Sequence, residues 1–500
     1  MFNLNTLNLK KIPYMRKKYA SFKNGINVDY DENILPVQYS TNTYNYDYSN
    51  GALRDGIGIN VPVIHYSYAY YRYTKQIDTQ NQDVHSSYLF NYWDTTDSRH
   101  YSLLIIYCGD GKAYYNMLHN SSTLMTAIPG VTFTSTPKFC SFKINGVDTL
   151  IMTSETDGMY TWIPYGTAVH VENVPQINSM CIHNERMFVT TCGEAKSVWF
   201  SDDFDPTNFN LTLQEGGFVE MSDEFGKSNK VVSLGGYLYV IRDFNIARIS
   251  AYADQRKFTL QQLYVSNSRI YENTVALCGN KIFYLANDGL YVFNGRSSKK
   301  IRLSINTMFD NTNNYFAVGG YVGGYYYLAC NINFNDGKTV GCENSQIYRN
   351  NALIKINVTT GELCILRGYD VRNVCVINDL YDPWVMVSMW DYETYNYEFG
   401  RVDMSGKVFN VATQKEWQSP YNDFGYPDKD KLIKEITLLS KSNCTVEVCC
   451  DGYIKSYSLV GKNQYQTIKL HQKAKRIALN FKSNSANTYI SNPQVVVGVL

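Results

Sequence analysis

The chain has 500 residues, which is enough for a large core and for two or three domains. It carries 46 Lys plus Arg against 45 Asp plus Glu, a formal net charge of +1. This balance excludes the global cationic excess of a protein that grips nucleic acid through its phosphates, although local basic patches stay open. The short basic runs are expected to be solvated faces or a flexible arm. They are Lys10, Lys11, Arg16, Lys17 and Lys18 near the start, and Lys473, Lys475 and Arg476 near the end.

Tyrosine is the unusual residue, with 44 copies beside 23 Phe and 6 Trp. It suits half-buried strands, and its amphipathic ring also anchors protein interfaces. With 12 Pro and 33 Gly, the composition is that of an ordered, β-rich chain. The 12 cysteines show no C-x-x-C motif and no framework spacing, so we expect reduced, mostly buried thiols.

Residues 1–60 are predicted to form a polar N-terminal arm and the segment that leads into the next domain. The opening MFNLNTLNLKKIPYMRKKYA has no apolar run of secretory length. No segment of the chain reaches the ~18 apolar residues of a membrane-spanning helix. The protein is therefore expected to be made and folded in a cytoplasm.

Residues 61–425 contain a repeat of short apolar runs rich in β-branched and aromatic residues. The runs recur about every 47 residues, which lies in the range of β-propeller repeats. Turn signals such as Asp-Gly follow several runs and lead into a second strand, as in CGDGKAYYNM and ANDGLYVFNG. We therefore predict an all-β protein with a β-propeller of about seven blades, six or eight being open. The runs are centred on Ile105, Ile151, Phe188, Tyr239, Phe283, Tyr326 and Val385.

In residues 426–500 the sequence pattern changes to five or so short strands in which apolar and polar residues alternate. They are predicted to form a small β-sandwich that ends in the apolar QVVVGVL.

No sequence motif identifies an enzyme. H-E-x-x-H, G-x-S-x-G, a P-loop and EF-hand spacing are all missing. The acidic cluster Asp202, Asp203 and Asp205 is compatible with a calcium or sugar site, but a turn before Pro206 is the favoured interpretation. SETDGMYTW, residues 154–162, nearly matches the Ser-x-Asp-x-Gly-x-x-Trp turn of sialidases; it is interpreted as a hairpin corner with Trp162 packed between blades. No catalytic, metal-binding or cofactor-binding residue is assigned, and no cofactor is expected.

Several phrases together resemble short-tailed bacteriophage tail proteins of the hub, nozzle or stabilisation class. NGINVDYDENILPVQYSTNTYNYDYSNGALRDGIGI resembles the family's segment that leads into a propeller. Its G-x-L-R-x-x-x-G phrase falls on Gly51, Leu53, Arg54 and Gly58. HNERMFVTTCGEAKSVWFSDDFDPTNFN is similar to a second family phrase through Arg186, Phe188, Trp199, Phe200, Ser201, Asp202, Asp205 and Pro206. The Tyr- and Asn-rich amino-acid usage resembles that of proteins of crAss-like phages.

The resemblance implies a virion protein of the tail, made in the cytoplasm of a bacterial host. It implies a sixfold or twelvefold ring below the portal, in contact with portal, adaptor or neighbouring ring proteins. Double-stranded DNA would pass through the channel without being held, in keeping with the neutral chain. The insertion NINFNDGKTVGCENSQIYRN departs from the family and is predicted to be a docking loop.

Candidate interface residues are Tyr44, Tyr46 and Tyr48 of NTYNYDYSN, taken to be exposed, together with Lys17 and Lys18 of the arm. Ordinary packing or disorder is the competing interpretation for all five. The alternative function is a carbohydrate-binding or glycosidase-type propeller, such as a receptor-binding tail component. A scaffold of the WD40 or kelch sort is disfavoured because neither W-D nor a double glycine recurs in every blade.

Overall fold

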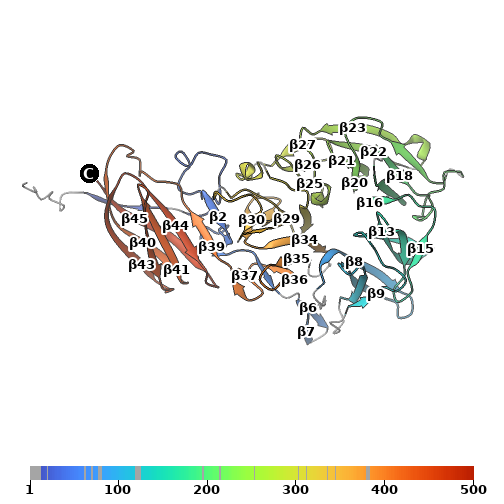
Figure 1. Cartoon of the computed structure of the whole chain (residues 1–500), viewed down its shortest axis with the longest axis horizontal. Helices are drawn as coiled ribbons and strands as arrows, with labels where there is room; N and C mark the ends of the chain where they lie inside the picture. The colour runs from blue at the N-terminus through green and yellow to red at the C-terminus, as the bar shows by residue number, and fades with distance from the viewer. Residues whose placement is uncertain are drawn as a thin grey trace, which may run out of the picture.

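The computed structural model describes residues 13–500 apart from 20, 61–62, 69–70, 77–81, 119–124, 194–195, 213–214, 253, 302, 311, 335, 344 and 379–382. Residues 63–68 and 71–76, the strands β6 (Val63–Tyr68) and β7 (Tyr71–Gln76), are described by their backbone alone. The described chain is all-β, with three short 3-10 helices (Gln255–Lys257, Glu272–Thr274, Asn306–Phe309) and no α-helix. Two β bodies lie end to end along an elongated molecule (Figure 1).

The larger body is a β-propeller of seven blades, as the sequence predicted, and each blade is an antiparallel sheet. Blade 1 contains β8 (Val84–Asp94), β9 (Arg99–Cys108), β10 (Ala113–Met117) and β11 (Thr126–Ala127). Blade 2 contains β12 (Lys138–Ile144), β13 (Val147–Ser154), β14 (Gly158–Trp162) and β15 (Val169–Val171). Blade 3 contains β16 (Ile177–His183), β17 (Arg186–Thr191), β18 (Ser197–Phe200) and β19 (Gly217–Glu220). Blades 4 and 5 are formed by β20 (Ser228–Leu234), β21 (Tyr237–Arg242), β22 (Asn245–Ser250) and β23 (Thr259–Val265), and by β24 (Ala276–Cys278), β25 (Lys281–Ala286), β26 (Gly289–Phe293) and β27 (Ser298–Lys300).

Blade 6 contains β28 (Val318–Val322), β29 (Tyr325–Cys330), β32 (Ala352–Asn357) and β33 (Leu363–Arg367). An insertion between β29 and β32 carries the small hairpin of β30 (Cys342–Glu343) and β31 (Gln346–Ile347). Blade 7 contains β34 (Asp370–Ile377), β35 (Trp384–Asp391) and β36 (Asn396–Asp403). Its β34 contacts β8 of blade 1, which closes the ring.

The seven apolar runs of the sequence are the second strands of the seven blades: β9, β13, β17, β21, β25, β29 and β35. Their central residues are at most 4% exposed. A second strand is covered on both faces because its blade packs between two neighbours, so its sequence is a continuous apolar run rather than an alternating one. The repeat in the sequence therefore records burial on both faces.

The fourth strand of blade 7 comes from the N-terminal segment. Here β5 (Gly58–Asn60) pairs antiparallel with β36, so that Gly58 faces Asp403 and Asn60 faces Arg401. A Cβ on Gly58 would lie 2.8 Å from the backbone carbonyl oxygen of Lys407, so this close approach needs a glycine. The strands β37 (Lys407–Val408) and β38 (Val411–Ala412) continue the same sheet.

The smaller body is a β-sandwich at the other end of the molecule. One sheet has the order β3 (Tyr46–Asp47), β4 (Leu53–Asp55), β45 (Tyr489–Val499), β40 (Lys431–Ser440) and β43 (Tyr465–Ala474), and β1 (Tyr14–Lys18) also pairs with β45. The other has the order β2 (Asn42–Tyr44), β39 (Lys415–Gln418), β44 (Ile477–Ser483), β41 (Cys444–Cys450) and β42 (Tyr453–Leu459). Both sheets thus take strands from the segment before residue 60, and β39 lies before the predicted start of the C-terminal domain at 426.

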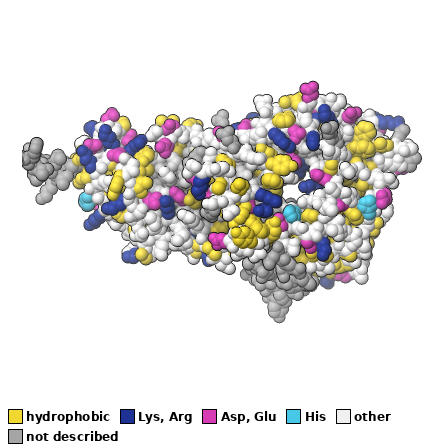
Figure 2. Space-filling model, in the orientation of Figure 1, with side chains coloured by type: hydrophobic (Ala, Val, Ile, Leu, Met, Phe, Trp, Pro, Cys, Tyr) yellow, Lys and Arg dark blue, Asp and Glu magenta, His cyan; other side chains and the backbone are white. Residues whose placement is uncertain are grey.

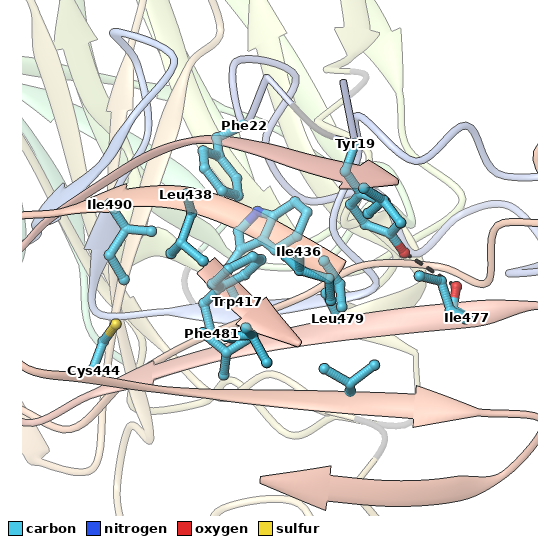
Figure 3. Close-up of a cluster of buried hydrophobic side chains, with 14 of the residues drawn as sticks. Tyr19, Phe22, Trp417, Ile436, Leu438, Cys444, Ile477, Leu479, Phe481 and Ile490 are labelled. Carbon is cyan, nitrogen blue, oxygen red and sulfur yellow. Dashed lines mark hydrogen bonds between the residues drawn. The ribbon is translucent and has the colours of Figure 1, made fainter. Parts of the chain in front are cut away.

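The sandwich core is organised around Trp417, which is 0% exposed. The ring of Phe22 meets it edge-on at 4.8 Å between centroids, and Phe481 lies at 5.9 Å (Figure 3). Tyr19 lies at the end of this core and donates from its hydroxyl to the carbonyl of Ile477 at 3.1 Å. Two of these four rings belong to the N-terminal segment, so that segment is part of the sandwich core.

Replacement of Trp417 tests this packing. Trp417→Ala leaves a cavity and is expected to lower the free energy of unfolding by about 3–5 kcal/mol. Trp417→Phe keeps most ring contacts and removes an indole N–H that has no hydrogen-bond partner in the described structure, so it should cost clearly less. Urea unfolding followed by circular dichroism measures both, and equal losses for the two variants would contradict the proposed packing.

Candidate functional site

Two of the predicted interface tyrosines are buried inside the chain. Tyr46 is 1% exposed and Tyr48 is 5% exposed, both in the sandwich core. The expectation that they are exposed is wrong, because the arm folds as strands of the sandwich and turns these rings inward. Tyr48 packs on Gly25, where a Cβ would lie 2.4 Å from its ring. Burial raises the pKa of Tyr46 well above its usual value.

Tyr44 is half-buried where the two bodies meet. Its hydroxyl donates to Glu416 Oε2 at 2.6 Å, which ties β2 to β39. Its ring lies 5.1 Å from the guanidinium of Arg367 and 6.2 Å from the ring of Phe334. Tyr44 therefore joins the sandwich to blade 6 of the same chain.

The predicted lysines lie on β1 at the edge of the sandwich. Lys17 Nζ donates to the carbonyl of Phe424 at 2.9 Å and lies 5.7 Å over the ring of Tyr426. Lys18 is exposed. The structure brings neither lysine to the three tyrosines as one site, and the role of Lys18 at an interface stays a prediction. Lys10 and Lys11 lie outside the described residues.

The insertion of blade 6, predicted to be a docking loop, is fastened to its own chain by Arg367. Arg367 Nε donates to Glu343 Oε1 at 2.7 Å, and the guanidinium also pairs with Asp336. The same guanidinium lies 3.9 Å from the ring centroid of Phe334. These contacts bury Phe334 and Glu343, whereas Ile347 on the other strand of the small hairpin is 81% exposed.

The acidic cluster before Pro206 forms a turn, as favoured from the sequence. Asp205 Oδ1 accepts from the backbone N–H and the hydroxyl of Thr207 at 3.0 and 2.6 Å. Asp203 pairs with Arg186 Nε at 2.7 Å. No group of three or more His, Cys, Asp or Glu side chains within the described residues could hold a metal ion.

The SETDGMYTW stretch is the β13–β14 hairpin, and Trp162 packs between blades 1 and 2 as predicted. The Trp162 indole donates to the carbonyl of Gly166 at 2.9 Å. Asp157 accepts from Ser154 Oγ at 2.7 Å and from the backbone N–H of Thr134 at 2.8 Å. Burial alone would raise the pKa of Asp157, but hydrogen bonds from Ser154, Thr134 and Thr156 hold it at about 2. This carboxylate anchors a corner between two blades.

The twelve cysteines are free thiols, in agreement with their spacing in the sequence. Burial raises the pKa of Cys108, Cys278, Cys364 and Cys375 to about 12. Thiols of this kind carry little thiolate near neutral pH and serve as small packing groups.

A polar concavity with a volume of about 710 Å³ lies on the axis of the propeller. Residues from the first strands of all seven blades take part in its wall. Sequence analysis missed it because its wall is assembled from short stretches of all seven blades, spread from Asp83 to Asn378. The signal that could have located it is the register of polar residues on the first strands.

The charged side chains that line this axial cavity are four cations and three carboxylates: Lys138, Lys230, Arg349 and Arg372, with Asp83, Glu155 and Glu272. Lys230 Nζ donates to the carbonyl oxygens of Val275 at 2.8 Å and Glu272 at 3.4 Å. Burial, helped by the nearby charge of Lys138, lowers the pKa of Lys230 to about 8, and burial also lowers the pKa of Lys138. In the part of the chain that the structure describes, neither ammonium has a carboxylate within 4.0 Å. Glu155 and Glu272 act on them only from farther away.

Two exposed aromatic rings stand in the wall of the same cavity. Tyr315 is 60% exposed and Phe316 is 53% exposed, and their rings meet edge-on at 5.3 Å. The guanidinium of Arg349 lies 5.3 Å from the centroid of Phe316. The cavity therefore combines cationic groups with apolar ring surface, which can bind an anionic or polyhydroxylated ligand.

Comparison with known proteins gives no family. No family model matches the sequence, and no curated protein matches it either. Among solved structures, the chain is similar to BBS1N in complex with ARL6DN in crystals soaked with mercury, at 10% identity over 61% of this chain and 88% of that one, with a TM-score of 0.37. The same complex in crystals soaked with lead gives 11% identity, 60% and 88% coverage and a TM-score of 0.38. Similarity this low carries no argument about function. No helix in the described residues is long and apolar enough to cross a membrane.

Asp157 gives a prediction for pH dependence. Its pKa in the folded chain, about 2, lies below the ordinary 3.8, so the ionised form stabilises the fold above pH ~4, and this stability is lost as the pH falls towards 2. Asp157→Asn should therefore destabilise the protein at pH 6, and the difference from the wild type should shrink at pH 3. Urea unfolding at both pH values measures this. A difference that is the same at pH 3 and pH 6 would disprove it.

Arg367 gives a prediction for the insertion. Arg367→Met leaves the Glu343 side chain, 6% exposed, with Lys338 Nζ at 3.3 Å as its remaining cation, and should cost about 3 kcal/mol in urea unfolding. The double variant Arg367→Met with Glu343→Gln should recover part of this loss. Lys300→Met is the matched control, since it breaks an exposed pair with Asp288 and should cost less than about 1 kcal/mol. Equal effects of Arg367→Met and Lys300→Met would refute the role of Arg367.

Proposed function

We propose that this chain is a structural subunit of a bacteriophage tail. It assembles as a sixfold or twelvefold ring below the portal and forms part of the conduit through which the genome leaves the virion. The proposal combines the sequence resemblance with one feature of the structure, an apolar unpaired edge at the sandwich end of the molecule.

This sandwich edge is formed by β42 and the start of β43, which are the outermost strands of the two sheets. Four large apolar side chains lie exposed on these strands or the loop between them, beside the exposed Lys455 and Ser456: Tyr453 at 64%, Ile454 at 59%, Val460 at 65% and Tyr465 at 55%. An edge strand offers unpaired N–H and C=O groups to a further strand, and an apolar edge gains free energy when it is covered. A neighbouring copy in a ring would cover it.

Two further features support the same proposal. The N-terminal segment supplies strands to both bodies, so one stretch of chain is hydrogen-bonded to the sandwich and to blade 7 of the propeller. On the face seen in Figure 2, basic and acidic side chains are interspersed rather than separated by sign. A surface of this kind favours passage of DNA over retention, because no extended cationic field holds the phosphates.

Single-particle imaging of the purified chain, alone and with portal-containing particles, tests the proposal. The expected result is rings with a central channel, or decoration of the tail vertex. Ile454→Asp places a charge on the sandwich edge and should reduce ring formation at least tenfold. Ile163→Asp, at a position on the propeller that is 49% exposed, is the matched control and should leave assembly unchanged.

A chain that remains monomeric at high concentration and never joins the tail would overturn the proposal. Rings that form equally well with Ile454→Asp would leave the ring standing and remove the sandwich edge as its interface.

A further inference from the structure

We infer that the axial cavity of the propeller binds an acidic sugar, a pyranose ring that carries a carboxylate. This is the cavity on the axis of a single subunit, distinct from any channel of a ring of subunits. The inference does not depend on assembly, so it can fail or hold independently of the proposed function.

Two ammonium groups lie in the wall of the axial cavity. Lys138 and Lys230 project from β12 and β20, the innermost strands of blades 2 and 4, into one cavity. The charge of Lys138 disfavours the charged form of Lys230, and Lys230 is bonded to carbonyl oxygens rather than to a carboxylate. An entering carboxylate would relieve this repulsion, and in a confined site the ion pair is only weakly screened by solvent. The cavity is therefore prepared for one negative charge.

Two aromatic side chains give the cavity wall an apolar surface. Tyr315 and Phe316 precede β28 and stand in the cavity wall with more than half of each side chain exposed. The C–H face of a pyranose packs on an accessible aromatic ring of this kind. A bare phosphate or carboxylate would leave them uncovered. The rings therefore point to a ligand with a flat, weakly apolar face besides its charge.

Other residues of the cavity wall supply hydrogen-bonding groups. Glu155, Glu272 and Asn273 also line the cavity, and their oxygens and amide group can exchange hydrogen bonds with several hydroxyl groups. Carboxylates next to lysines would weaken the binding of a purely anionic ligand but suit a ligand with many hydroxyl donors and one charge. The volume of about 710 Å³ falls within the range of pockets for small ligands and has room for one or two sugar rings.

Isothermal titration of the full chain with glucuronate, glucose and inorganic phosphate tests this inference. Glucuronate should bind at least tenfold more tightly than glucose or phosphate. Lys138→Met and Lys230→Gln should each weaken glucuronate binding at least tenfold. Lys143→Met is the matched control, because Lys143 lies on β12 with Lys138 but pairs with Asp148 at the surface, 3.6 Å away. This variant should bind glucuronate as tightly as the wild type does.

Tyr315→Ala distinguishes the contribution of the sugar ring to binding from the contribution of the negative charge. It should weaken glucuronate binding at least fivefold and leave phosphate binding unchanged, whereas Tyr252→Ala, at an exposed tyrosine outside the cavity, should change neither. Phosphate binding as tight as glucuronate binding, with no effect of Tyr315→Ala, would replace the sugar site by a simple anion site. Failure of the folded wild type to bind glucuronate, or wild-type binding by folded Lys138→Met, would overturn the inference. An unchanged melting temperature identifies the variants that are folded.

Discussion

The structure depends on strand pairing between the two ends of the chain. Because β5 completes blade 7 beside β36, the propeller ring is closed by backbone hydrogen bonds between residues far apart in sequence. The strands just before β5 pair into the sandwich, with β4 beside β45 and β2 beside β39. The N-terminal segment therefore stabilises both bodies, and loss of its rings from around Trp417 would open the sandwich core.

Closure of the propeller also creates its axial cavity. A blade presents the start of its first strand to the axis, so seven short stretches that are distant in sequence share one space. Polar groups gathered in this way lose part of their hydration, which is why burial lowers the pKa of both lysines there. Elsewhere, Arg367 and Arg242 are buried beside carboxylates, whereas the buried Lys431 is bonded to carbonyl oxygens. The two lysines of the axis differ from Lys431 because they line an open cavity, and the acidic-sugar inference rests on that position.

The two proposals use opposite ends of the molecule. The sandwich end carries the exposed Tyr453 and Ile454 on an edge strand, whereas the axial cavity lies within the propeller. Subunits joined through the sandwich would leave the propeller face accessible. Figure 1 shows this separation, with the sandwich strands at one end and blades 2 to 4 at the other. An assembly function and a ligand site are thus compatible in one chain.

The sequence alone determined the elements whose signals are local. The seven apolar runs, such as those around Ile105 and Phe283, predicted about seven blades because a strand buried on both faces is apolar throughout. The Asp-Gly pairs predicted the hairpin turns. Only the tertiary structure decided the partners of the N-terminal strands, and it turned Tyr46 and Tyr48 inward against the expectation of exposure. It also brought Lys138 and Lys230 together. The physical reason is that strand periodicity lies within a few residues, whereas pairing and convergence depend on contacts between residues that no local pattern connects.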